Sequence, residues 1–210
     1  MIGIVDYGMG NLFSVSKALE RLGADYFMSS DPEKLAEAKA ILLPGVGAFK
    51  DAMDQLNSLG LTPFLKDYAV SGRPLLGICL GMQLLFENSN EYGFAEGLSL
   101  LPGTIRHFPG VDAEGNSYKV PHMGWNKLKY QVPSPLLDGI EESHVYFVHS
   151  YLAKTDSEII NASADYGEEV PAIVSRNNVM GMQFHPEKSG ETGMALLRNF
   201  INMSESKVTL

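Results

Sequence analysis

The sequence predicts an α/β fold, in the form of a three-layer sandwich around a mixed, mostly parallel central sheet. Three observations support this. Apolar runs without polar alternation occur in the first half of the chain, as in parallel strands that are buried on both faces. Segments with helical periodicity separate these runs. The second half holds short segments rich in β-branched and aromatic residues, which favour antiparallel strands with short connections.

In the first half, residues 2–5 form the first buried strand that we expect. A helix should follow, because apolar residues recur at helical spacing before a glycine stop, at Leu12, Val15, Leu19, Leu22 and Gly23. Further buried strands are expected at residues 40–45 and 74–78. The last of these leads directly into a helical pattern over residues 81–87.

In the second half, six segments are expected to form strands, several of them antiparallel: 102–108, 126–130, 145–153, 159–166, 171–176 and 179–184. An amphipathic helix over residues 192–202 should close the domain. No linker or repeat divides the chain, so we expect one domain over residues 1–210, with a frayed tail at about 204–210.

Composition excludes several classes of protein. The 210 residues are 45% hydrophobic, which is enough for a sizeable core, and the formal net charge is -9. An acidic chain is a poor ligand for nucleic acid, and it has no reason to bind an anionic membrane. One cysteine cannot form an internal disulfide, the first residues lack the basic start of a signal peptide, and no apolar run is long enough to span a bilayer. We therefore expect a cytoplasmic protein.

The only cysteine, Cys79, lies in the stretch GICLG between Gly77 and Gly81. Most lone cysteines are small buried hydrophobic residues. This one has the form of a nucleophile elbow, in which a sharp strand-to-helix turn needs small residues on both sides. The turn places the thiol at a helix N-terminus, where the dipole and free N–H groups favour the thiolate. Cys79 is therefore the candidate nucleophile.

A thiolate nucleophile needs a base and a group that orients the base. Of the five histidines, His185 stands out because it directly follows an apolar strand in GMQFHPEKS. Pro186 favours an extended chain here, so the side chains of His185 and Glu187 should project to the same side. Glu187 is then placed to accept one imidazole N–H while the other ring nitrogen faces Cys79.

The loop PGVGAF follows the strand expected at residues 40–45. In a parallel sheet this strand end lies beside the Cys79 turn, where α/β proteins bind ligands. Amides of this loop and of Leu80 are candidates for holding an oxyanion. A phosphate loop is excluded because no Gly-Lys-Ser/Thr follows, and a metal site is not expected, because the chain has one cysteine and no paired histidines at helical spacing.

Taken together, the three motifs PGVG, GICLG and HPE resemble those of the class I (triad) glutamine amidotransferases, which carry them in this order. Further segments, DYGMGNL, KVPHMGWN and YFVHSY, are similar to the glutaminase subunits of imidazole glycerol phosphate synthases. The similarity runs from Asp6 to Phe200. It implies a flavodoxin-like fold without a cofactor, and hydrolysis of glutamine to glutamate and ammonia.

The resemblance also implies roles for particular residues. The nucleophile, base and orienting carboxylate are Cys79, His185 and Glu187, and the oxyanion donors are Val46 and Leu80. The implied substrate-binding residues are Gly45, Gly47, Gln83, His149, Ser150 and Tyr151. The implied docking face and ammonia route comprise Asn11, Trp125, Tyr146 and Lys188. The implied partner is a cyclase subunit built as a β/α barrel, which would form a heterodimer with this chain and receive the ammonia.

Three alternatives are open from the sequence. One is a sister glutaminase that supplies ammonia for anthranilate, GMP or pyridoxal phosphate synthesis, which PHMGWN and the lysine of HPEKS disfavour. Another is a DJ-1-like elbow-cysteine protein, which leaves HPE unexplained. A third, a non-catalytic binding module with a vestigial site, is disfavoured by the intact triad. For a glutaminase with a separate partner, we also expect a resting loop in which the Val46 N–H is turned away from the oxyanion.

Overall fold

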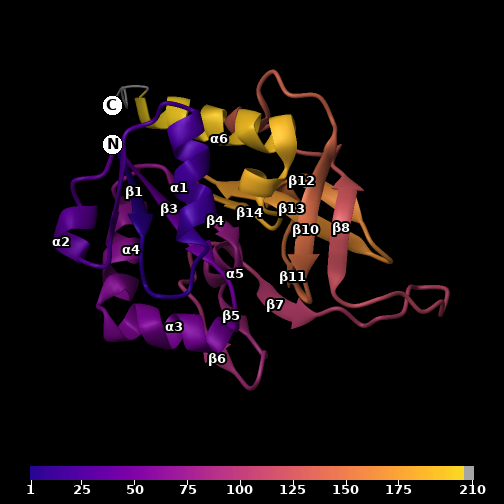
Figure 1. Ribbon diagram of the computed structural model, residues 1–210. Coiled ribbons are helices and arrows are strands. Elements are labelled where there is room, and N and C mark those ends of the chain that lie inside the picture. The colour runs from indigo at the N-terminus through magenta and orange to yellow at the C-terminus, as the bar shows by residue number, and fades with distance from the viewer. Residues whose placement is uncertain (206–210) are drawn as a thin grey trace.

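The computed structural model describes residues 1–205, and its centre is an eight-stranded sheet (Figure 1). Five neighbouring strands are parallel, in the order β2 (Tyr26–Ser29), β1 (Ile2–Val5), β3 (Ala40–Gly45), β4 (Leu75–Cys79) and β14 (Val179–Met182). Three antiparallel strands continue the sheet: β13 (Glu169–Arg176), β12 (Ile160–Asp165) and β9 (Lys129–Tyr130). The predicted mixed, mostly parallel sheet is confirmed.

Helices cover both faces of this sheet, which gives the expected three layers (Figure 1). On one face lie α1 (Leu12–Arg21) and α6 (Gly190–Glu205). On the other lie α2 (Pro32–Leu35), α3 (Phe49–Ser58), α4 (Leu61–Val70) and α5 (Leu80–Leu84). Alternate strand residues enter the two cores: Leu42 and Leu76 pack toward α1 and α6, whereas Ile41 and Leu75 pack toward α3 and α4.

Two smaller sheets stand beside the central one. Strand β8 (His122–Lys127) pairs antiparallel with β10 (His144–His149). The other sheet has the order β11 (Tyr151–Lys154), β7 (Thr104–His107), β5 (Asn88–Ser89) and β6 (Ala95–Glu96). Three short 3-10 turns, η1 (Pro135–Leu137), η2 (Ser157–Ile159) and η3 (Pro186–Lys188), complete the described elements.

Several predicted boundaries were wrong. The segment 145–153 is two strands that part at Ser150, because β10 pairs with β8 whereas β11 pairs with β7. The segment 126–130 likewise divides at the buried Leu128, between β8 and β9. Strand β2 and helices α2, α3 and α4 were not predicted. The pattern of apolar side chains indicates which residues are buried. It does not say which neighbouring strand supplies the hydrogen bonds, so it cannot locate the point at which a segment changes its partner.

Two predicted helices also have different ends. The helix expected over residues 81–87 is α5, which ends at Leu84 because the chain turns toward β5. The closing helix, α6, has 16 residues and runs to Glu205, so it includes the start of the expected tail, whereas residues 206–210 lie outside the described part. No helix within residues 1–205 has the length and apolar character needed to cross a membrane.

Among the glycines, Gly81 in the turn from β4 into α5 is the one at which an added Cβ would come nearest to another atom. A Cβ added at Gly81 would lie 1.8 Å from the Leu43 carbonyl oxygen, and one at Gly77 would lie 2.5 Å from the Gly81 oxygen. Between these glycines, Cys79 has φ 56 and ψ −114, a backbone conformation that is unusual for a residue with a side chain. The small residues predicted on both sides of Cys79 are required because backbone atoms lie in direct contact with Gly77 and Gly81.

We predict that Gly81→Ala lowers the free energy of unfolding by about 3 kcal/mol or more, because backbone atoms of β3 cannot yield to a methyl group. Urea unfolding followed by circular dichroism measures this. The matched control is Gly139→Ala, where φ is 71 and no atom lies within 4 Å of the added Cβ, so only left-handed strain of about 1 kcal/mol is expected. Equal destabilisation by the two substitutions would contradict the prediction.

Candidate active site

Cys79 opens into a pocket of about 480 Å³ at the carboxyl end of the parallel strands. The register pairs Cys79 with Gly45, the last residue of β3, which brings the two glycine-containing motifs together. Most of the residues predicted for catalysis, the oxyanion and the substrate line this pocket: Val46, Gly47, Cys79, Leu80, Gln83, His149, Ser150, Tyr151 and His185. The sheet therefore gathers residues that lie more than 100 positions apart in the sequence.

His185 and Glu187 form a direct pair. The Nδ1 atom of His185 lies 2.8 Å from Glu187 Oε1, and the two side chains are only 4% and 1% exposed. The backbone fixes the imidazole as well, because the His185 N–H donates to the Tyr146 carbonyl and the Ser189 hydroxyl donates to the His185 carbonyl. With Nδ1 held by the carboxylate, Nε2 is the ring atom left for Cys79.

The electrostatics of this pair favour a charged imidazole. Burial alone disfavours the imidazolium, but the neighbouring Cys79 and the hydrogen-bonded Glu187 outweigh it, and together they raise the pKa of His185 to about 9. A neighbouring imidazolium stabilises a thiolate by Coulombic attraction. The arrangement can therefore hold a thiolate and an imidazolium side by side at neutral pH.

The loop after β3 adopts one definite conformation. The Val46 N–H donates to the Met9 carbonyl at 2.9 Å, so in this conformation it is not directed to an oxyanion beside Cys79. Leu80 is the first residue of α5, where an amide has no acceptor within the helix. Of the two predicted oxyanion donors, Leu80 thus has an amide that needs no acceptor within its helix, whereas the amide of Val46 is bonded to Met9 and would need its peptide to rotate.

The opposite wall is built around the Tyr151 carbonyl. Gln83 Nε2 donates to this oxygen and to Gln183 Oε1, at 3.0 Å each. Both hydrogens of the Gln83 amide are then used, so the side chain offers its carbonyl oxygen to the pocket. That oxygen suits an ammonium group better than a carboxylate. The Ser150 carbonyl is held separately, by the Phe108 N–H at 3.0 Å.

Comparison with known proteins identifies the family. Residues 3–203 match the family model described as glutamine amidotransferase class-I.

The chain belongs to this family.

Its relatives are similar over almost their whole length. A Shouchella clausii protein named imidazole glycerol phosphate synthase subunit HisH is 60% identical over 205 residues, which cover 98% of this chain and 99% of the relative. The Bacillus subtilis protein of the same name is 55% identical over 210 residues, with 99% of each chain covered. A crystal structure of a glutamine amidotransferase superposes with a TM-score of 0.75 at 20% identity, over 97% of this chain and 98% of that one, which shows the shared fold.

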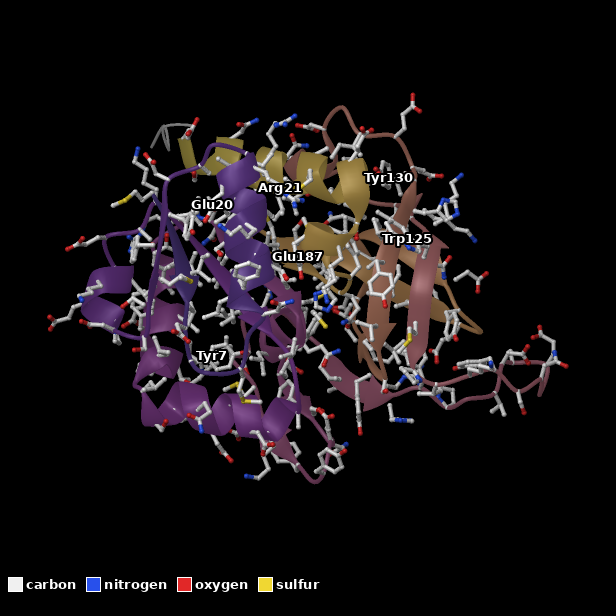
Figure 2. All side chains as sticks on the ribbon, in the orientation of Figure 1. Tyr7, Glu20, Arg21, Trp125, Tyr130 and Glu187 are labelled. Atoms are coloured by element: carbon white, nitrogen blue, oxygen red, sulfur yellow. The ribbon has the colours of Figure 1, made fainter. Side chains whose placement is uncertain are left out.

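The residues predicted for docking lie on the surface of this amidotransferase, away from the pocket floor. Trp125 is 57% exposed on β8, and its ring lies 6.1 Å from that of Tyr146 at an angle of 66°. Figure 2 shows Trp125 apart from the inner position of Glu187. Lys188 is exposed at the end of η3. Asn11 has a second, local role, because its side chain accepts the Ser14 N–H and caps α1.

Sequence reasoning missed several residues of the site. Glu91, Tyr92 and His107 line the pocket. Tyr7, which is labelled in Figure 2, is 2% exposed, and its hydroxyl has no hydrogen-bond partner in residues 1–205. Burial and then the proximity of Cys79 raise the pKa of Tyr7. The indication available in the sequence was that Tyr7 follows shortly after β1, a strand that adjoins β3. Residues at such a strand end lie at the ligand-binding edge of a parallel sheet.

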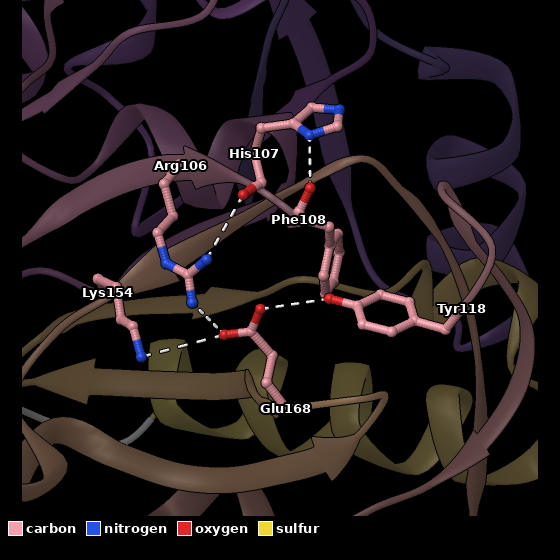
Figure 3. Close-up of polar contacts among 6 residues, drawn as sticks. All are labelled: Arg106, His107, Phe108, Tyr118, Lys154 and Glu168. Carbon is pink, nitrogen blue, oxygen red and sulfur yellow. Dashed lines mark hydrogen bonds and ion pairs between the residues drawn. The ribbon is translucent and has the colours of Figure 1, made fainter. Parts of the chain in front are cut away.

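A polar cluster fastens the four-stranded sheet that contains β7 and β11 to the central sheet (Figure 3). Arg106 on β7 forms an ion pair with Glu168, in the turn between β12 and β13. Lys154 lies 4.0 Å from the same carboxylate, and the Tyr118 hydroxyl donates to it at 3.5 Å. The next residue of β7 after Arg106, His107, lines the pocket, so this cluster helps to fix that wall.

We predict that His185 titrates near pH 9, whereas His122 and His149 stay neutral throughout the neutral range, because burial lowers the pKa of His122 to about 4 and that of His149 to about 3. NMR of labelled histidines over pH 5–10 measures all three. A raised pKa means that the stability contributed by His185 is complete below its unfolded pKa, about 6.5, and is lost as the pH rises through 9. Glu187→Gln should lower the midpoint of His185. A His185 midpoint near 6.5 in the unsubstituted protein would contradict the assignment.

Proposed function

We propose that this chain is the glutaminase subunit of an imidazole glycerol phosphate synthase and acts in histidine biosynthesis. The observation that carries the proposal is the buried His185–Glu187 pair beside Cys79, in a pocket that also holds the Gln83 amide. The family supports the reaction class. The names of relatives that are 55–60% identical over nearly the whole chain support the particular synthase.

The proposed reaction uses each group in turn. The Cys79 thiolate attacks the carboxamide carbon of glutamine, and the carbonyl electrons move onto oxygen, which the Leu80 amide stabilises. The His185 imidazolium then gives its proton to the leaving nitrogen, and ammonia departs as the thioester forms. Water attacks this thioester and gives a proton to His185, so that glutamate leaves and the thiolate–imidazolium pair is restored. Glu187 holds the imidazole in place and stabilises its charge.

The ammonia is proposed to pass to a cyclase subunit, a β/α barrel that forms a heterodimer with this chain. There the ammonia reacts with the nucleotide PRFAR, which gives imidazole glycerol phosphate and AICAR. This step is the lyase part of the overall reaction. Exposed Trp125 and Lys188 support a docking face on this side of the molecule. The free, buried thiol of Cys79 supports a reducing compartment, the cytoplasm.

The first two alternatives are weaker than this proposal. For a sister glutaminase, the similarity to a putative GMP synthase subunit structure is only 21% identity, which speaks for the fold alone. A DJ-1-like function leaves the buried Glu187 carboxylate, which lies 2.8 Å from the His185 imidazole, without a role. The curated relatives that cover nearly the whole chain are instead named as HisH subunits.

We predict that Cys79→Ala abolishes glutamine-dependent turnover of the complex but leaves ammonium-dependent turnover intact, since the cyclase reaction takes place elsewhere. The measurement is imidazole glycerol phosphate formation with glutamine and, separately, with an ammonium salt. A variant that keeps wild-type glutaminase activity would exclude Cys79 as the nucleophile. Loss of both activities would exclude the proposed separation of the two sites.

We also predict that the free chain hydrolyses glutamine about 10²–10³-fold more slowly than the complex with cyclase and a nucleotide analogue, which is the typical effect of one missing oxyanion donor. The reason is the bond from Val46 N–H to the Met9 carbonyl, which must break before Val46 can serve. Glutaminase rates of the free chain, the binary complex and the liganded complex measure this.

The Gly47→Val variant tests whether this loop is the moving part. Gly47 has φ 103, and an added Cβ would lie 2.9 Å from Met9 Cε, so the substitution disfavours the present loop conformation. We expect a changed ratio between the free and liganded rates. Val46→Ala, which retains the backbone, is the matched control. A free chain that is as fast as the liganded complex, or an unchanged ratio in Gly47→Val, would rule out the switch.

A further inference from the structure

A chain of side-chain hydrogen bonds runs from β8 to the substrate wall. His149 Nδ1 lies 2.7 Å from the Tyr151 carbonyl, and His149 Nε2 lies 3.0 Å from His122 Nδ1. His122 Nε2 in turn lies 3.3 Å from Asn126 Nδ2. Both rings are buried, at 7% and 2% exposed. None of these contacts is needed to explain the Cys79 chemistry itself.

Chemistry fixes every proton in this chain. A carbonyl oxygen can only accept, so His149 Nδ1 carries the hydrogen and Nε2 is bare. The bare Nε2 accepts from His122 Nδ1–H, which leaves His122 Nε2 to accept from the amide of Asn126. The bonds therefore all point the same way, from Asn126 to the Tyr151 carbonyl. Protonation of His149 at Nε2 would set two N–H groups against each other, and the lowered pKa values of both rings, caused by burial, agree with a neutral pair.

Packing holds the His122 ring in one plane. It is stacked between Phe147, at 4.4 Å, and Tyr166, at 4.0 Å, with 19° between the ring planes in each case. Phe108, which Figure 3 shows beside Tyr118, lies 5.2 Å from the His149 ring. Neither imidazole can turn without displacing an aromatic ring, so the hydrogen-bond chain is rigid at its centre.

The end of this chain meets a break between two sheets. Strand β10 follows its partner β8 up to His149, and β11 begins with its partner β7 at Tyr151. Ser150, which lines the pocket, therefore falls between two ladders. The Tyr151 carbonyl is held by two side chains, His149 from β10 and Gln83 from α5.

The start of the chain lies behind an exposed strand face. Along β8, His122 is buried and Asn126 is half-buried, whereas Met123 and Trp125 are 59% and 57% exposed. Successive residues of a strand point to opposite faces. A molecule that contacts Met123 and Trp125 therefore contacts the same strand that carries His122 and Asn126 on its other face. Behind this face, the hydrogen bonds that begin at Asn126 reach the substrate wall through two imidazoles, those of His122 and His149.

We propose that His122 and His149 form a positioning relay that holds the Ser150–Tyr151 backbone in the geometry that binds glutamine, and that ties this wall to the exposed face of β8. The inference rests on the proposed glutaminase function. A merely structural histidine pair would affect the fraction of folded enzyme and so kcat. A positioning relay affects the affinity for glutamine and so KM.

The decisive variant is His122→Phe, assayed as glutaminase in the complex with the cyclase subunit. Phenylalanine keeps the stacking between Phe147 and Tyr166 but removes the hydrogen bonds. We expect KM for glutamine to rise about tenfold, the typical effect of one lost hydrogen bond, and kcat to change less. His122→Asn, whose amide nitrogen replaces Nδ1 as a donor, should restore most of the affinity. His144→Gln, on the exposed end of β10, is the matched control and should leave both constants unchanged.

A second variant covers the case in which His122→Phe does not fold. Asn126→Asp has the same size but presents an acceptor to His122 Nε2, and it also removes the donation from Asn126 Nδ2 to the Asp165 carbonyl. In the neutral His122 ring the hydrogen then lies on Nε2, so Nδ1 is bare and cannot donate to His149. The same rise in KM is expected. A wild-type KM in either folded variant, or equal KM values for His122→Phe and His122→Asn, would overturn the proposal.

Protection of the thiol separates this proposal from the function on which it rests. Cys79 is the only cysteine, so alkylation by iodoacetamide, followed by mass spectrometry, reports one site. If glutamine fails to protect Cys79 in the unsubstituted complex, the proposed glutaminase function fails. If the same concentration of glutamine protects Cys79 in both the unsubstituted complex and the His122→Phe complex, the relay is wrong and the proposed glutaminase function stands. Weaker protection in His122→Phe supports it.

Discussion

The active-site turn depends on backbone contact between α5 and β3 with no side chain between them. A Cβ at Gly81 would lie 1.8 Å from the Leu43 oxygen, so only glycine allows the helix to start where it does. This start fixes the backbone conformation of Cys79 and brings Leu80, the first residue of α5, into the lining of the pocket. The parallel ladder then adds Gly45 beside Cys79, and β14 delivers His185 on the other side.

Burial acts with different outcomes on three histidines: His149 and His185, which line the pocket, and His122, which is hydrogen-bonded to His149 behind it. It disfavours the charged form of each, and for His122 and His149 it lowers the pKa to about 4 and 3. His185 is also buried, but Glu187 and Cys79 supply negative charge and hydrogen bonds, and its pKa rises to about 9. The nearest polar partner, not the depth of burial, decides the charge. The protein thereby keeps one imidazolium for chemistry and two neutral rings for directional hydrogen bonds.

The pocket joins segments that belong to three different sheets. The central sheet supplies Cys79 and His185, whereas the wall formed by Ser150 and Tyr151 lies where β10 leaves one small sheet and β11 enters another. Ladders cannot orient such a junction alone, so side chains add to them. The backbone N–H of Phe108 holds the Ser150 carbonyl, whereas the Gln83 amide and the His149 ring hold the Tyr151 carbonyl.

The sequence alone determined the parallel core, the elbow at Cys79 and the pairing of His185 with Glu187, because each depends on local rules. Continuous apolar runs predict buried strands, flanking glycines predict a sharp turn, and a proline between two residues favours an extended spacing. The tertiary structure alone decided which segments pair, and so the breaks at Ser150 and Leu128. It also decided the burial of Tyr7 near Cys79 and the contact between His122 and His149. These depend on residues that are distant in the chain, where no local pattern records the partner. The bond between Val46 N–H and the Met9 carbonyl is of the same kind, because a glycine-containing loop is free to rotate and only its neighbour selects one state.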